Sequence, residues 1–169
     1  MEGSAGDLAV LSLDGASELL LATEFDERNA QLSPNGKWLA YESDESGQYE
    51  IHVRPYPNVD EGHWQISRDG GTRPLWAPDG RELFYLTYRG ELMQVPVQTE
   101  RSFEQGNAEL LLRGNYVVGT ISAARAYDIS PTGERFLMIK EAPDETSRAE
   151  IILVQNWFQE LERLVPTER

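Results

Sequence analysis

One tight-turn sequence occurs three times in the chain, as Ser33-Pro34-Asn35-Gly36, as Ala77-Pro78-Asp79-Gly80 and as Ser130-Pro131-Thr132-Gly133. Proline presets the φ angle that the second position of such a turn requires, and glycine accepts the positive φ that often follows. We therefore expect six residues to define the turns structurally: Pro34, Gly36, Pro78, Gly80, Pro131 and Gly133. A motif that recurs at intervals of roughly 40 to 50 residues indicates a repeat fold.

Short segments rich in apolar and aromatic residues flank each turn in the same register, and their composition predicts β-strands. The segments before the turns are Ala30–Leu32, Arg73–Trp76 and Ala126–Ile129, and those after them are Lys37–Tyr41, Arg81–Tyr85 and Glu134–Met138. A third strand is expected at Glu50–Arg54, Glu91–Val95 and Glu150–Val154, and a fourth at Trp64–Ser67 and Glu109–Leu112. Each copy is thus a meander of up to four antiparallel strands.

Four short antiparallel strands repeated at this spacing are typical of a β-propeller blade. A β-sandwich is the alternative, but a sandwich has no reason to repeat one turn in register with the strand that follows it. We predict a single all-β domain, residues 1–169, that forms a partial propeller of about three and a half blades. Its units are the end of one blade at 7–22 and further blades at 29–67, 72–112 and 125–155.

The residues after the last predicted strand change to helical spacing. Asn156 is a suitable N-cap, and Trp157, Phe158, Leu161 and Leu164 share one face of a helix. We therefore expect a short tail helix at 156–165, with its apolar face covering the last blade.

Charge and composition exclude several classes of partner. The chain has 15 Lys and Arg against 29 Asp and Glu, a net charge of −14, which repels nucleic acid and anionic lipid. It has no Cys, no apolar run long enough to span a bilayer and no export signal. As written, the sequence predicts a cytoplasmic location without membrane insertion, and an extracytoplasmic one if it is part of a membrane-anchored protein.

The turn and the Trp38-Leu39-Ala40-Tyr41 strand resemble the TolB-like six-bladed propeller repeat, also called the WD40-like or PD40 repeat. The resemblance extends from about Asp7 to Val154. More narrowly, the runs at 25–29, 64–71, 127–140 and 156–164 resemble the C-terminal part of propellers fused to bacterial serine/threonine protein kinases. That resemblance implies a sensory or interaction module, although no kinase motif or membrane segment occurs here.

We find no motif for catalysis or for a cofactor. TolB-like propellers also cap prolyl-oligopeptidase-type peptidases, yet the nearest string to a nucleophile elbow, 119–123, has the wrong spacing. His52 alternates with apolar residues in a predicted strand and is a poor candidate for a base, as is His63. The acidic stretches 44–47 and 60–62 lack the calcium-loop pattern and are interpreted as solvated connections. We predict no metal site.

Three arginines lie near the start of the first strand of successive units. Arg28 and Arg125 precede their turn prolines by six residues, and Arg73 precedes its own by five. Because this strand is innermost in a propeller, we expect the three guanidinium groups at one mouth of the central channel, suited to a carboxylate or phosphate. The alternative is that the arginines are ordinary loop charges, paired with the nearby acids Asp26, Glu27 and Asp69.

The sequence favours a non-catalytic module that binds a protein or a small acidic ligand. An accessory propeller domain of a hydrolase is the alternative. Because closed propellers typically have four to eight blades, we expect this chain to need either a second copy, as a homodimer, or the remainder of a longer propeller.

Overall fold

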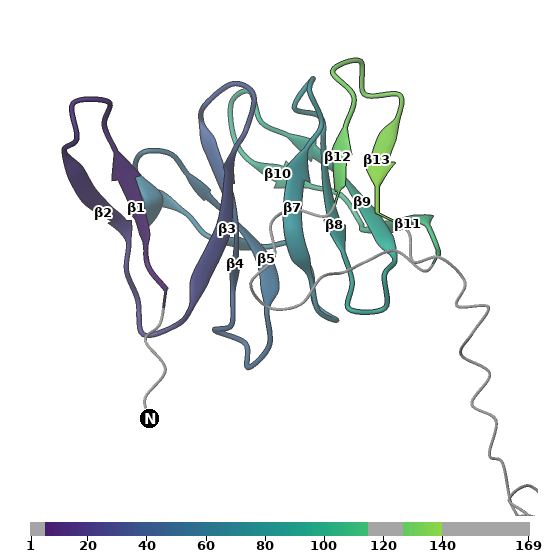
Figure 1. Cartoon of the computed structure of the whole chain (residues 1–169), viewed down its shortest axis with the longest axis horizontal. Coiled ribbons are helices and arrows are strands. Elements are labelled where there is room, and N and C mark those ends of the chain that lie inside the picture. Colours follow the sequence, from purple (N-terminus) through teal and green to yellow (C-terminus); the bar gives the residue numbers. More distant parts are fainter. Residues whose placement is uncertain (1–5, 115–126, 140–169) are drawn as a thin grey trace, which may run out of the picture.

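The computed structural model describes residues 6–114 and 127–139, which form four antiparallel sheets arranged side by side like an open fan (Figure 1). The first sheet pairs β1 (Leu8–Leu11) with β2 (Ser17–Leu21), and the last pairs β12 (Tyr127–Ile129) with β13 (Phe136–Met138). The second sheet runs in chain order through β3 (Glu27–Leu32), β4 (Trp38–Ser43), β5 (Glu50–Pro55) and β6 (Trp64–Gln65). The third contains β7 (Thr72–Trp76), β8 (Glu82–Leu86), β9 (Leu92–Gln98), β10 (Glu104–Gln105) and β11 (Glu109–Leu112).

The repeated turn has the same geometry in all three copies. Gly36, Gly80 and Gly133 have φ angles of 68°, 70° and 77°. Each glycine donates its backbone N–H to the carbonyl three residues earlier, at 2.8, 2.9 and 2.8 Å. All three glycines thus lie in the left-handed region, where a side chain is strained.

The second and third sheets stack through strands that are largely buried on both faces, β4 and β8. All six residues of β4 are buried, and consecutive side chains point to opposite faces. Ala40 belongs to the core shared with Leu83 of β8, whereas Tyr41 packs with Leu21 of β2. A strand buried on both sides in this way is typical of a propeller blade between two neighbours. The all-β fold expected from the repeat is confirmed.

The third sheet differs from the expected four-stranded meander. Both β10 and β11 pair with β9, β10 near Gln98 and β11 near Leu92. The two-residue strand β10 was not predicted, and β6 is shorter than expected. A short 3-10 helix, η1 (Val59–Glu61), lies between β5 and β6. The strand at 150–154 and the tail helix at 156–165 fall outside the described residues.

No helix among residues 6–114 and 127–139 is long and apolar enough to cross a bilayer.

Candidate functional site

The first strands of three successive sheets, β3, β7 and β12, surround a cavity of about 480 Å³ together with β13. Its lining is Asn29, Ala30, Arg73, Pro74, Tyr127, Asp128, Leu137 and Ile139. Each of these three strands is the first of its sheet along the chain. The cavity therefore lies where the first strands of neighbouring blades meet. This is where the sequence places the predicted arginines.

Arg73 is the cationic residue of the cavity lining. It is only 6% exposed, and its Nε and Nη1 atoms are buried without a hydrogen-bond partner. The backbone at Arg73 is fixed from both sides, because its N–H donates to Glu42 and its carbonyl accepts the Tyr127 hydroxyl at 2.6 Å. Arg73 also has a φ of 57°, which costs a residue with a side chain roughly 1–2 kcal/mol. The protein thus holds a buried guanidinium group in which two nitrogens, Nε and Nη1, have no hydrogen-bond partner.

Glu42 of β4 connects the second sheet to the third, and its side chain is fully buried. One oxygen, Oε2, accepts from Nε of Arg28 at 2.8 Å. The other, Oε1, accepts from the Asn29 amide at 2.8 Å, the Thr72 hydroxyl at 3.0 Å and the backbone of Arg73. A carboxylate with this many donors is well compensated for its burial.

Arg28 is committed to internal contacts rather than to the cavity. Besides its ion pair with Glu42, its guanidinium carbon lies 3.4 Å from the centre of the Tyr49 ring. Stacking on an aromatic face is a common use of arginine inside proteins. Arg28 therefore pairs with a buried acid of the neighbouring strand, Glu42, which is a different partner from the Asp26, Glu27 and Asp69 of the alternative interpretation.

The structure also shows that Arg28 and Arg73 are not equivalent in register. Asn29 and Arg73 each lie at the bulge of their strand, each precedes its turn proline by five residues, and both have a positive φ, 52° and 57°. Arg73 thus corresponds to Asn29, and Arg28 corresponds to Thr72. Arg125 lies outside the described residues.

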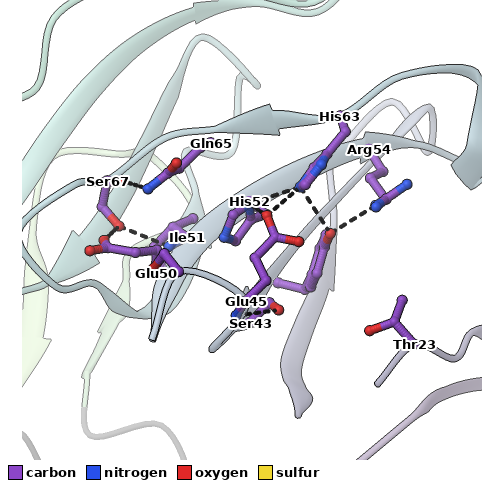
Figure 2. Close-up of polar contacts among 12 residues, drawn as sticks. Thr23, Ser43, Glu45, Glu50, Ile51, His52, Arg54, His63, Gln65 and Ser67 are labelled. Carbon is purple, nitrogen blue, oxygen red and sulfur yellow. Dashed lines mark hydrogen bonds and ion pairs between the residues drawn. The ribbon is translucent and has the colours of Figure 1, made fainter. Parts of the chain in front are cut away.

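A second cluster lies on the other side of β4, where Figure 2 shows Glu45, His52 and His63 pointing toward one another. Nε2 of His63 is 2.9 Å from Nδ1 of His52, and Oε1 of Glu45 is 3.4 Å from each of these nitrogens. The Tyr41 hydroxyl is 3.4 Å from His63 Nε2 and accepts from Nε of Arg54 at 2.8 Å. Glu45, His52 and His63 each offer one potential metal-ligand atom, and these three atoms lie within 4.8 Å of one another.

Burial disfavours the charged form of both imidazoles. Burial, together with the charges of His63 and Arg54, lowers the pKa of His52 to about 4. Burial and Arg54 also lower the pKa of His63, while Glu45 acts in the opposite direction. Two neutral imidazoles and a carboxylate are a donor set that can bind a metal ion.

Sequence reasoning missed this cluster because it treated the three residues one at a time. The pairing register of β5 and β6 would have indicated the cluster. Val53 pairs with Trp64, so His63 lies beside the end of β5 that holds Arg54. Residues 52 and 54 share one face of the strand. His52 and His63 therefore meet on that face.

Comparison with known proteins supports the fold. The chain resembles TolB from Acinetobacter baumannii with a TM-score of 0.61 over 85% of its length, at 15% sequence identity. It also matches a TolB-type structure from Agrobacterium tumefaciens over 63% of its length, with 23% identity and a TM-score of 0.47. The fold is that of a partial TolB-like β-propeller.

The chain covers 34% of the Acinetobacter protein, so it spans about a third of the length of that propeller protein. No protein-family model and no curated protein sequence matches it.

Proposed function

We propose that the chain is a non-catalytic binding module whose cavity between β3, β7 and β12 takes an anionic group. The observation that supports this most strongly is Arg73, a buried guanidinium with two unpaired nitrogens in the lining of a cavity. Leaving such donors unpaired costs about 1–3 kcal/mol or more, and a carboxylate or phosphate oxygen would satisfy them.

The rest of the lining fits a partly apolar ligand with one anionic end. Pro74, Leu137 and Ile139 provide apolar surface, while Tyr127 is engaged with the Arg73 carbonyl. The acid in the lining, Asp128, uses Oδ1 to accept the N–H of Ile129 at 2.9 Å. A peptide carboxylate beside small apolar side chains has the chemistry that this surface would recognise.

The test is an NMR titration of the full chain with three probes: tri-alanine with a free carboxylate, tri-alanine amide and inorganic phosphate. We expect saturable shifts of the Arg73 Nε–H signal with the free carboxylate or phosphate and none with the amide. Arg73→Gln should abolish binding, whereas Arg101→Gln, at an exposed arginine, should not. Equal binding by Arg73→Gln, or no saturable binding of either anion, would refute the proposal.

We further infer that the module is the sensory or interaction part of a protein related to propellers fused to bacterial serine/threonine kinases. This rests on the sequence resemblance of residues 25–29, 64–71 and 127–140. The complete gene provides the test: a kinase domain encoded in the same reading frame would support the inference, and a hydrolase domain would contradict it.

A further inference from the structure

We propose that Glu45, His52 and His63 form a binding site for one Zn²⁺ ion, on the side of the second sheet that faces β1 and β2. Glu45 comes from the connection between β4 and β5, His52 from β5, and His63 from the segment just before β6 (Figure 2). The site is separate from the cavity lined by Arg73 and does not depend on the function proposed for it.

The spacing of the ligand atoms fits a tetrahedral ion. For zinc bonds of about 2.0–2.1 Å, two ligands of a tetrahedron lie about 3.3 Å apart. Oε1 of Glu45 is 3.4 Å from His52 Nδ1 and 3.4 Å from His63 Nε2, and the two nitrogens are 2.9 Å apart. If His52 Nδ1 and His63 Nε2 move apart by a few tenths of an ångström, the three ligand atoms occupy three corners of the tetrahedron.

The donor set selects among metal ions. Calcium and magnesium prefer oxygen ligands, whereas two imidazoles and a carboxylate are a known zinc arrangement with one open position. The side chains of Glu45 and His63 are 29% and 32% exposed, so the open position can take a water molecule and the ion can enter from solvent. His52, which is fully buried, forms the inner end of the site.

The surroundings keep the ligands ready to bind. Glu45 supplies the negative charge that partly compensates a divalent ion. Tyr41, held by Arg54 at 2.8 Å, lies beside His63 Nε2 and restricts the space around that ligand atom.

The next sheet shows that the fold itself does not require these ligands. In the second sheet Tyr41 faces His52 across the β4–β5 pair, and at the matching place in the third sheet Tyr85 faces Met93. The turn after β4 places Glu45 where the turn after β8 places Tyr88, since Gly47 and Gly90 close the two turns with the same hydrogen bond. The third sheet thus forms the same repeat with a methionine and a tyrosine at the two positions that hold His52 and Glu45 in the second.

The experiment titrates the metal-free full chain with Zn²⁺ by calorimetry at pH 7.5, and with Co²⁺ by visible absorption. We expect one ion per chain, tetrahedral Co²⁺ bands and a higher melting temperature with zinc. Because the chain has only two histidines, imidazole ligation detected in the Co²⁺ complex can come from His52 and His63 alone. Absence of saturable binding would overturn the proposal.

Three variants remove one ligand each: Glu45→Gln, His63→Gln and His52→Met, the last of which copies Met93 of the next sheet. Loss of a residue that only hydrogen-bonds to a metal ligand typically lowers the affinity by roughly 10–100-fold. Each of these variants lacks a ligand itself and should lower the affinity for Zn²⁺ by more than that. His63→Gln changes a partly exposed residue and keeps the test valid if His52→Met does not fold. Glu61→Gln, in the exposed acidic stretch, is the control. Unchanged affinity in the ligand variants, or an equal loss in Glu61→Gln, would show that zinc binds elsewhere.

Discussion

Arg73 occupies the place in β7 that Asn29 occupies in β3, with nearly the same left-handed backbone, φ 57° against 52°. Asparagine tolerates this conformation, whereas arginine is rarely found in it. The guanidinium of Arg73 is also buried with two unpaired nitrogens. The third sheet therefore carries a destabilising residue at the edge of the cavity, which is the pattern expected where binding is favoured over stability.

Replacing Arg73 with Asn should make the protein more stable. The change relieves the backbone strain and removes a buried unpaired cation, and we expect a gain of about 1 kcal/mol or more in the free energy of unfolding. Urea unfolding of Arg73→Asn against Arg101→Asn measures it. A clear loss of stability would mean that Arg73 serves the fold and not a ligand.

Replacing Glu42 with Gln should destabilise the protein. The amide cannot pair with Arg28 as a carboxylate does, and we expect a loss of about 2 kcal/mol, as for a hydrogen bond to a charged group. A double-mutant cycle with Arg28→Gln should show coupling between the two residues. Glu61→Gln is the exposed control, for which a change within about 0.5 kcal/mol is expected. If Glu42→Gln and Glu61→Gln changed the free energy of unfolding by similar amounts, the role given to Glu42 would be excluded.

Replacing Gly36 or Gly80 with Ala should cost about 1 kcal/mol each through the backbone alone. An added Cβ at Gly36 meets nothing within 4 Å, and at Gly80 its nearest neighbour is 3.6 Å away, so crowding does not contribute. The larger side chain in Gly36→Val and Gly80→Val should destabilise further. Gly106→Ala is the matched control, because Gly106 does not have a positive φ and its Cβ would make ordinary contacts at 3.5 Å. Equal melting temperatures for Gly36→Ala and the wild type would contradict the turn assignment.

The metal-free protein should lose stability as the pH falls below 6.5. The pKa of His52 is about 4 in the folded chain and about 6.5 when unfolded, so between these values the unfolded state binds more protons. His63, Arg54 and Glu45 face the same imidazole, and the lowered pKa of His63 acts in the same direction. The slope is at most about 1.4 kcal/mol per pH unit for each histidine.

Urea unfolding at pH 7.5, 6 and 5 in the presence of a chelator measures this dependence. His52→Met should show a shallower decline than the wild type, since the variant lacks one of the two groups. Identical slopes for both proteins would show that His52 does not contribute to the pH dependence.

Local chemistry explains why the architecture could be predicted and the sites only in part. The turn at Gly36 is encoded within four residues, and the run of apolar and aromatic residues that follows it marks a strand. The bulge at Arg73 could not be predicted from the sequence, because an arginine does not indicate a positive φ. The backbone there is held by contacts with Glu42 and Tyr127, which lie far away in the chain. The cluster of Glu45 and the two histidines depends on how β5 pairs with β6 after the η1 connection, a register that no single segment contains.

The alternation of side chains along β4 has an evolutionary consequence. Tyr41 contacts the histidine cluster on one face, and its neighbour Glu42 contacts Arg28 and Arg73 on the other. Adding or deleting one residue in the turn before β4 would exchange the two faces, because strand side chains have a period of two. Both sites would then be lost in one mutational event. Length variation in descendants of this sequence is therefore expected in the loops at the outer edge of the sheets, while the spacing between Pro34 and Glu42 stays fixed.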